Sequence, residues 1–364
     1  GQVWYDSTAN TLQYQIPNVT AAGSWRTGNN MNTARYIAAG AGIQTASIAF
    51  GGRTSSEVAI NESYDGTSWT EVGDLNVAKR TYIGAGTSTA ALTAGGTPGD
   101  GNLATAELWD GSSWTEVGDL NTARRDHAGS KGSSTSAIVF GGYISAGSAL
   151  AESWNGSSWT EVADLNSDRR GQGSAGADNT SALSITGYSD AAPNAQVALV
   201  ESWNGSAWTE IADVNTARYD TRGTGTSTSA LAFGGTPPVT GKTESYNGSS
   251  WTEQGDLSQV RMSQAGSGAD NTSALCAGGN IPPHTAATEE WTGAGASVGA
   301  WSTGGTMNVE RDFTSGTGTQ TSALVFGGLK PPGSTLTGET ESYDGTSWTE
   351  VADLNTARED HGAA

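Results

Sequence analysis

The chain has 364 residues, of which 37 are acidic and 17 basic, so its formal net charge is −20. Such a charge repels phosphate backbones and anionic headgroups, which argues against binding of nucleic acid or of membrane surfaces. Only 15% of the residues are charged and glycine is abundant, a composition that favours short strands and tight turns over helices. No apolar run approaches the roughly 20 residues of a membrane-spanning helix, so membrane insertion is not expected.

The first element expected along the chain is a small hairpin over residues 1–17. Trp4 and Tyr5 precede a turn expected around Ser7–Asn10, and a second run of alternating apolar residues follows. Residues 1–24 are therefore predicted to form a hairpin and linker that is suited to act as an anchor for the rest of the chain.

A repeat occupies the remainder of the chain. Eight tryptophans are each followed ten residues later by a basic residue, and successive tryptophans are 44, 45, 45, 49, 43, 50 and 47 residues apart. A period of this length is typical of one supersecondary unit that buries its apolar faces against copies of itself. The pairs are Trp25/Arg35, Trp69/Lys79, Trp114/Arg124, Trp159/Arg169, Trp208/Arg218, Trp251/Arg261, Trp301/Arg311 and Trp348/Arg358.

Each unit contains four strand-like segments in a fixed order. An apolar strand ends in a double glycine, and the last two strands are joined by Asp-Gly or Asn-Gly, as at Asp65-Gly66, which is a strong signal for a tight hairpin. Seven units of four antiparallel strands predict an all-β fold, a seven-bladed β-propeller over residues 25–364. The units are expected at residues 35–75, 79–120, 124–165, 169–214, 218–257, 261–307 and 311–354.

These motifs resemble the Kelch repeat family over roughly residues 25–364. Kelch blades carry a double glycine after the second strand, here Gly234-Gly235, and an aromatic residue on the third, here Tyr246. A tryptophan lies on the fourth strand, here Trp251, and a basic residue opens the next unit, here Arg261. The resemblance implies a propeller of four-stranded blades.

The repeats depart from this pattern in three places. Thr186-Gly187 replaces a double glycine, and the step from Trp291 to Trp301 implies a longer outer hairpin in the sixth unit. Trp25 supplies an extra outer strand and residues 358–364 an extra inner one. These leftovers could close the ring by strand exchange or begin an eighth blade, and the second reading predicts that the chain belongs to a longer polypeptide.

Most of the repeated residues are interpreted as structural. The basic residues of the repeat are expected to pair with the repeated acidic residues, the alternative being a cationic ring that binds an anion. Cys276, the single cysteine, is expected to be a small core residue. The tryptophans expected to pack between blades, rather than to stack on sugars, are Trp69, Trp114, Trp159, Trp208, Trp251 and Trp348.

The sequence offers little for catalysis, and no enzyme activity, metal or cofactor is expected. Residues 63–69 are similar to the Asp-box of sialidase-like propellers but lack one residue, and the hairpin turn explains them. His127, His284 and His361 fall in three different units without metal-ligand spacing, which argues against a copper site like that of galactose-oxidase-like Kelch enzymes.

Recognition is predicted on the segments between each double glycine and the third strand. Their lengths vary, while the rest of the repeat keeps a nearly fixed spacing, and in a Kelch-like ring they all emerge on one face. Drift in unconstrained loops is the competing explanation. The candidate binding residues on this face are Arg53, Tyr143, Tyr188, Asp190, Lys242, His284 and Lys330.

A second resemblance concerns the start of the chain. Residues 1–6, GQVWYD, are similar to short G-x-x-W-Y-[ND] segments of bacteriophage tail fibres, and the repeats look like virion structural proteins of marine, cyanophage-like phages. This resemblance implies a virion appendage on the particle exterior that binds a host cell-surface glycan or protein. It also implies contacts of the N-terminal segment with other virion proteins, and it is compatible with a homo-oligomer. The alternatives are a cytoplasmic Kelch-type interaction scaffold and a propeller glycosidase or lyase.

Overall fold

The computed structural model consists of β-strands joined by turns. No helix occurs within the residues that it describes, which confirms the expected all-β class. The chain divides into two compact units, Ala21–Gly295 and a second formed by Gly1–Thr20 with Ala296–Ala364, so the first is inserted in the sequence of the second. The described residues are 3–6, 11–19, 23–81, 83–191, 195–281, 284–293, 297–303, 307–309, 315–319, 322–330, 335–344 and 347–358.

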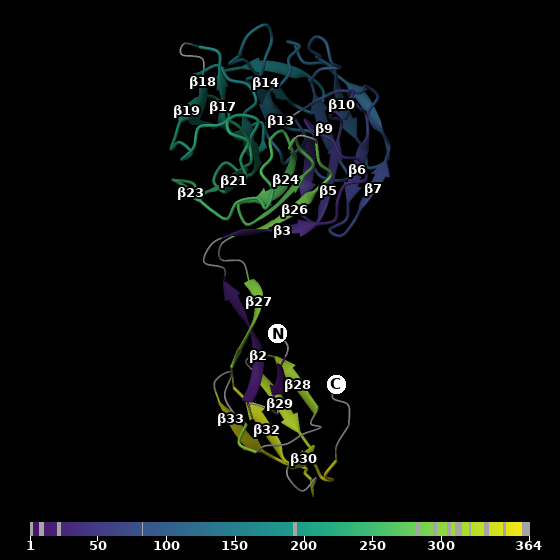
Figure 1. Cartoon of the computed structure of the whole chain (residues 1–364), viewed down its shortest axis with the longest axis vertical. Helices are drawn as coiled ribbons and strands as arrows, with labels where there is room; N and C mark the ends of the chain where they lie inside the picture. Colours follow the sequence, from purple (N-terminus) through teal and green to yellow (C-terminus); the bar gives the residue numbers. More distant parts are fainter. Residues whose placement is uncertain are drawn as a thin grey trace. The chain divides into compact units, whose positions relative to one another are not determined.

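Unit Ala21–Gly295 holds six four-stranded antiparallel sheets around a common axis (Figure 1). The first three sheets are β4–β7 (Ala39–Ile43, Ala46–Phe50, Asn61–Tyr64, Trp69–Val72), β8–β11 (Ala85–Gly86, Ala91–Ala94, Ala106–Trp109, Trp114–Val117) and β12–β15 (Ala128–Gly129, Ala137–Phe140, Ala151–Trp154, Trp159–Val162). The next two are β16–β19 (Gly173–Asp178, Ser181–Ser189, Ala195–Trp203, Trp208–Glu210) and β20–β23 (Arg222–Gly225, Ala230–Phe233, Thr243–Tyr246, Trp251–Glu253). The sixth combines β24 (Ala265–Asp270), β25 (Ser273–Ala277) and β26 (Thr288–Thr292) with β3 (Ser24–Gly28) from the start of the chain.

The local sequence explains each sheet. In the first, the turn at Asp65-Gly66 joins β6 to β7, and the Asp65 carboxylate accepts hydrogen bonds from the backbone N–H groups of Thr67 and Ser68 at 2.8 and 2.7 Å. Gly66 has a φ of 94°, which an L side chain rarely adopts. The Asp-Gly and Asn-Gly dipeptides therefore set the hairpin that places the tryptophan of the outer strand in the first five sheets.

Apolar packing between neighbouring sheets closes the ring. Six clusters of buried residues each combine two adjacent sheets, including the pair formed by the first and the sixth. Phe50 meets the ring of Trp114 in the next sheet at 4.8 Å, and Phe140 meets Trp208 at 4.7 Å, both edge to face. Of the tryptophans expected to pack between blades, Trp69, Trp114, Trp159, Trp208 and Trp251 lie in the ring and are 5–7% exposed. Trp348 is 6% exposed but lies in the other unit, where it clusters with residues of its own repeat.

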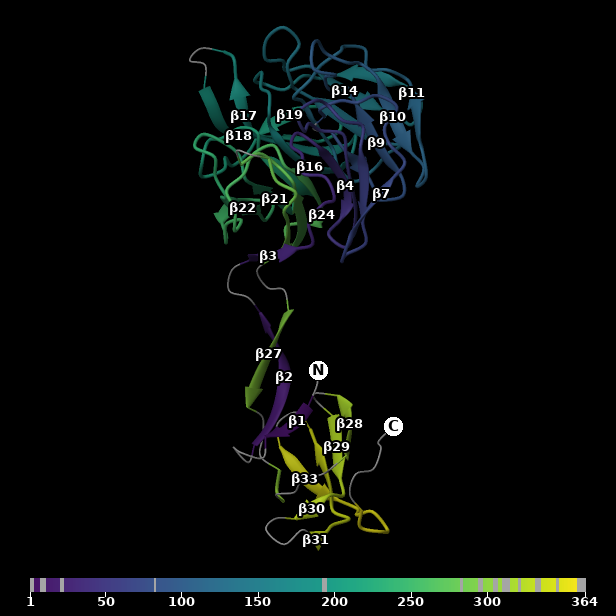
Figure 2. The ribbon, with the colours of Figure 1, turned by 45° about the vertical axis from the view of Figure 1, so that its right-hand side comes forward.

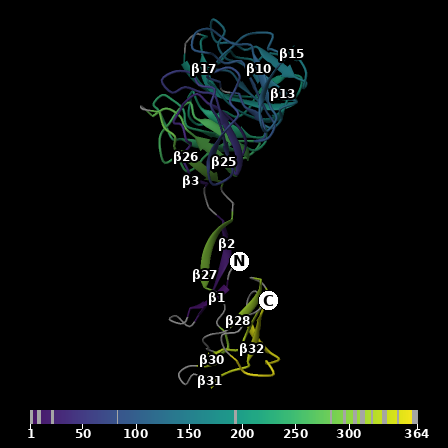
Figure 3. The ribbon, with the colours of Figure 1, turned by 90° about the vertical axis from the view of Figure 1, so that its right-hand side faces the viewer.

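Strand exchange with the N-terminal end of the unit completes the sixth sheet. β3 pairs with β26 in antiparallel register, with Trp25 opposite Trp291, and the two strands lie side by side in Figure 3. The pair reproduces the aromatic pairs of the other sheets, such as Tyr64 opposite Trp69. The sequence analysis considered ring closure by strand exchange or the start of an eighth blade, and in the structure the strand of Trp25 closes the ring.

The expected seven blades are corrected to six in the ring, which is consistent with a β-propeller. Because β3 fills the outer position of the sixth sheet, the long hairpin expected between Trp291 and Trp301 does not form. Trp301 lies instead in β27 (Ser297–Thr303) of the other unit. The ring therefore ends at Gly295, whereas the sequence analysis placed the propeller at 25–364.

The second unit contains the expected N-terminal hairpin and the seventh repeat (Figure 2). β1 (Val3–Asp6) pairs with β2 (Thr11–Val19), and β2 also pairs with β27; the turn expected at Ser7–Asn10 lies outside the described residues. The seventh repeat forms a four-stranded sheet of β28 (Ser315–Thr319), β29 (Ser322–Phe326), β32 (Thr340–Tyr343) and β33 (Trp348–Val351), and β30 (Leu329–Lys330) pairs with β31 (Thr335–Leu336).

Candidate functional site: the loop face of the ring

The basic residues of the repeat form buried ion pairs within the ring. Each pairs with the glutamate on the third strand of its own sheet: Arg35 with Glu62, Lys79 with Glu107, Arg124 with Glu152, Arg169 with Glu201, Arg218 with Glu244, and Arg261 with Glu289. All twelve side chains are at most 2% exposed. Arg311 lies outside the described residues. The pairing satisfies these cations internally, which argues against a cationic ring that binds an anion.

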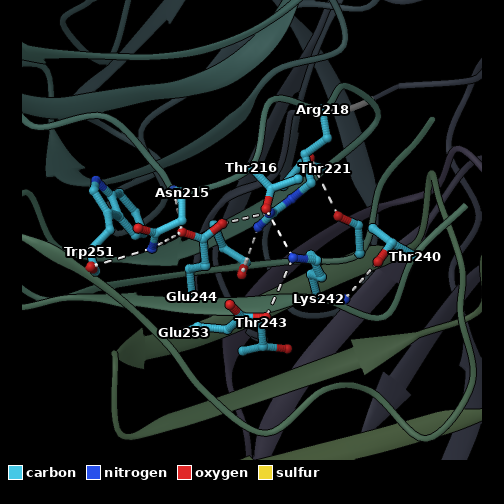
Figure 4. Close-up of polar contacts among 12 residues, drawn as sticks. Asn215, Thr216, Arg218, Thr221, Thr240, Lys242, Thr243, Glu244, Trp251 and Glu253 are labelled. Carbon is cyan, nitrogen blue, oxygen red and sulfur yellow. Dashed lines mark hydrogen bonds and ion pairs between the residues drawn. The ribbon is translucent and has the colours of Figure 1, made fainter. Parts of the chain in front are cut away.

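Figure 4 shows how one pair is completed. Glu244 accepts hydrogen bonds from Arg218 at 2.6 Å and from the backbone N–H and side-chain amide of Asn215 at 2.6 and 2.7 Å. The amide of Asn215 also contacts the carbonyl oxygen of Trp251. A buried carboxylate with this many donors is well satisfied, so residues 213–218, D-V-N-T-A-R, are a structural element of the ring.

The segments predicted to carry recognition do emerge together on the ring. The residue after each basic residue forms an isolated β-bridge with the residue directly after the strand-ending glycine pair or its equivalent, and this repeats from sheet to sheet. We call the surface formed by these segments the loop face. The bridges are Tyr36–Arg53, Arg80–Thr97, Arg125–Tyr143, Arg170–Tyr188, Tyr219–Thr236 and Met262–Asn280.

On the loop face, arginines and tyrosines form a continuous row across three sheets. The Arg125 guanidinium lies 4.4 Å from the ring centre of Tyr143, and that of Arg170 lies 5.5 Å from Tyr143 and 4.9 Å from Tyr188. Tyr188 meets Tyr219 edge to face at 5.4 Å. These five residues, the tyrosine–arginine row, are all half-buried, so their rings are held in place and still reach solvent.

Asp190 fixes the middle of this row. Its carboxylate pairs with Arg170 at 3.2 Å and accepts a hydrogen bond from the backbone N–H of Gly147 at 2.6 Å. Its own backbone N–H donates to Asp168 at 3.0 Å. The structure therefore brings three of the predicted residues, Tyr143, Tyr188 and Asp190, into one cluster.

The other predicted residues lie apart from this row. Arg53 pairs with Glu57 at 3.0 Å, and the ring of His284 lies 5.8 Å from that of Tyr36. Lys242 contacts the hydroxyl of Thr216 at 3.1 Å on the outer part of its sheet. Lys330 belongs to the other compact unit, so it is not placed on the loop face.

Sequence reasoning missed the residues next to the axis on this face. The second residue after the basic residue takes a positive φ in most sheets, as at Asp126 (54°) and Asp220 (53°). Backbone hydrogen bonds link these positions from one sheet to the next, for example from the N–H of Asp220 to the carbonyl of Gly171 at 2.6 Å. Because conformational strain of this kind is retained only where the fold determines it, these residues form a rigid collar.

Positively charged residues act on one collar residue, Asp126. Burial raises the pKa of Asp126, the positive charges of Arg125, Arg80, Arg170 and Arg222 oppose this rise, and Arg125 lies 3.6 Å from the carboxylate. In the sequence, Arg80, Arg125 and Arg170 each directly follow a basic residue of the repeat, at positions 79–80, 124–125 and 169–170. The row carries both guanidinium groups and aromatic rings, a combination suited to polar or anionic groups that can also stack on a ring.

Within the described part of the chain, no group of three or more histidine, cysteine, aspartate or glutamate side chains could hold a metal ion. Burial lowers the pKa of His127 to about 3, so this histidine is neutral and packs in the core. No helix among the described residues is long and apolar enough to cross a membrane.

Comparisons with known proteins identify the fold and nothing further. Neither models of known families nor curated protein sequences match this chain. Among solved structures it is similar to that of YjhT, with a TM-score of 0.60 and 13% sequence identity. The match covers 72% of this chain and 95% of YjhT. At this identity the likeness concerns the arrangement of the strands and not the chemistry of the loop face.

Proposed function

We propose that this chain is a non-enzymatic recognition protein whose loop face binds a glycan on a host cell surface. The observation that carries the proposal is the tyrosine–arginine row, in which Tyr143 lies near the guanidinium groups of Arg125 and Arg170, and Tyr188 lies near that of Arg170 and the ring of Tyr219. Aromatic rings fixed in this way provide flat faces for sugar rings, and guanidinium groups provide forked donors for hydroxyl and carboxylate oxygens.

Rigidity supports recognition rather than turnover. The row is carried on closed sheets, and Arg170 is already held by Asp190, so little conformational freedom is lost when a ligand binds. The carboxylates of the face are engaged as well: Glu57 contacts both Arg53 and Arg80, at 3.0 and 3.2 Å. A carboxylate held between two cations is a weak general base, which disfavours a glycosidase or lyase reading.

We further propose that the protein is an exterior component of a bacteriophage particle of the Kelch-like, tail-fibre type. The second unit, which contains the N-terminal hairpin, would contact other virion proteins, and copies of the chain could assemble with one another. Support comes from the sequence resemblance of residues 1–6 and from the insertion of the ring between β2 and β27, which connects it to the second unit through two segments. Immunogold labelling of purified particles tests this part.

A glycan array tests the binding proposal. Tyr188→Ala should lower the signal for the bound glycan at least tenfold, because it removes one stacking face and one partner of Arg170. Thr160→Ala is the matched control, since Thr160 is exposed on the outer strand of a ring sheet, and Lys330→Ala tests the second unit. Equal binding by Tyr188→Ala and the parent chain would refute the assignment.

The same experiment separates the alternatives. Binding only to a protein partner, with no glycan signal, would favour a Kelch-type interaction scaffold. Release of sugar from a surface polysaccharide, abolished by one carboxylate substitution, would favour a glycosidase or lyase. Either result would overturn the proposal for this face.

A further inference from the structure

One residue breaks the pattern of the innermost strands. At one repeated position of the innermost strands, five of the six ring sheets carry glycine and the third carries Lys131; the register places Gly42 opposite Ser47 and Gly86 opposite Ala91. The backbone N–H of Gly86 donates to the carbonyl of Lys131, and the N–H of Lys131 to that of Gly176, at 2.7 and 2.8 Å. The equivalent glycines are Gly42, Gly86, Gly176, Gly225 and Gly268.

These positions surround a cavity on the axis of the ring. Its volume is about 290 Å³, near the lower limit of ligand pockets, and all six sheets contribute to its lining. Glycine and alanine dominate the lining, and the polar side chains are those of Thr87, Ser88, Thr226 and Lys131. The absence of side chains at five positions creates the space, and a lysine enters it from the sixth.

The Lys131 ammonium has no partner among the described residues. The side chain lies in the cavity lining and the residue is 9% exposed, yet no hydrogen bond or ion pair of its Nζ is formed. Burial, together with the positive charge of Arg222, lowers the pKa of Lys131 to about 7. No carboxylate lines the cavity, so a buried cation lacks the counter-ion that such groups normally have.

We propose that this axial cavity binds a small organic monocarboxylate, with Lys131 as the counter-ion of the carboxylate. One ammonium matches one negative charge, and the hydroxyls of Thr87 and Thr226 can donate to the same group or to polar substituents. The mainly apolar remainder of the lining suits an uncharged body of roughly monosaccharide size or smaller. A phosphate dianion would need more donors than the cavity provides.

The site is independent of the function proposed for the loop face. The loop face lies where the innermost strands begin, whereas Lys131 and its equivalent glycines lie near the turns where those strands end. A substitution that abolishes binding in the axial cavity should therefore leave binding at the loop face unchanged, so each proposal can be refuted without the other.

Nuclear magnetic resonance of protein labelled with ¹³C at lysine Cε tests the proposal. Acetate, lactate and glucuronate are added, with glucose and inorganic phosphate as comparison probes, while the Lys131 resonance is titrated with pH. At least one carboxylate should raise the pKa of Lys131 by about one unit, which corresponds to about tenfold tighter binding to the charged form. Affinity should fall as the pH rises through about 7.

Two variants separate charge from shape. Lys131→Gly restores the residue of the five sister sheets and should fold, and Lys131→Met keeps the length of the side chain without its charge. Both should lose carboxylate binding at least tenfold by calorimetry, and the control Lys242→Met should not. A Lys131 resonance that none of the three carboxylates shifts would overturn the proposal, as would equal binding of phosphate or undiminished binding by Lys131→Met.

Discussion

The second ring sheet offers a direct test of how the buried ion pairs hold the ring, through the substitution Lys79→Arg. In three sister sheets the arginine binds its glutamate and also donates to the carbonyl oxygen two residues before that glutamate, as Arg124 does to Leu150 at 2.7 Å. Lys79 lies 3.2 Å from Glu107 and makes no hydrogen bond, and the hydroxyl of Thr105 nearby in sequence is also unpartnered.

The magnitude follows from the groups left without partners. A hydrogen bond to a charged group contributes about 1.5–3 kcal/mol, and a guanidinium in place of the ammonium would add at least one, to Glu107 or to the carbonyl of Thr105. Part of this gain is lost to the larger volume of arginine in a close-packed site, so we expect a net stabilisation of about 1–2 kcal/mol. For a unit of this size that is a rise in Tm of about 2–8 °C, measurable by calorimetry.

The reverse substitution is the control. Arg124→Lys should lower the Tm by a similar amount, because it removes the contact with Leu150 and leaves the charge of Glu152 paired. Lys79→Arg could prove neutral or destabilising while Arg124→Lys is also neutral. The second hydrogen bond that a guanidinium makes would then not contribute to stability, and this account of the buried ion pairs would be refuted.

Three further predictions concern other parts of the ring. The pKa of Lys131 is about 7 in the folded chain against 10.5 as its ordinary value, so the unfolded chain binds more protons between these pH values and stability rises with pH across that window. Lys131→Met should therefore stabilise the ring at pH 6, by up to about 5 kcal/mol, and the gain should vanish towards pH 10.5 in urea titrations. Trp25→Ala removes the indole that packs against Phe233 and Trp291, and should cost about 3 kcal/mol and increase amide exchange along β26, whereas the exposed Thr27→Ala should do neither. Burial raises the pKa of Cys276 to about 12, so thiol reagents at pH 8 should label it only at the rate at which the ring opens.

The module could be predicted because its signals are local. The turn at Asp65-Gly66 and the spacing from Tyr64 to Trp69 depend only on residues that are adjacent in the chain, and the structure forms the predicted hairpin there. Even the exception at Thr186 keeps the backbone of the missing glycine, with a φ of 61°. Here a requirement of the fold on the backbone overrides the preference of the residue.

The candidate sites depend on relations between repeats, which the sequence encodes less directly. Tyr143 and Tyr188 were identified from loop variability, but the sequence analysis did not single out their partners Arg125 and Arg170, which follow the structural arginines. Lys131 was recognisable only by aligning the first strands, where it is the one charged residue in a column of glycines. A charge in a position that backbone packing otherwise reserves for glycine is the signal to look for in such repeats.

The number of blades could not be read from the number of repeats, because the ring is decided by which strand pairs with β26. β3 takes that place, and the first and sixth sheets then pack together through Tyr64 and Leu275, which leaves no gap for another sheet. The seventh repeat shows the consequence. Leu324 corresponds to Ile138 and Leu231, which are fully buried by neighbouring sheets, and it is 39% exposed. The same sequence pattern is a blade only where a neighbouring sheet covers it, so the closing strand, and not the motif, sets the size of the ring.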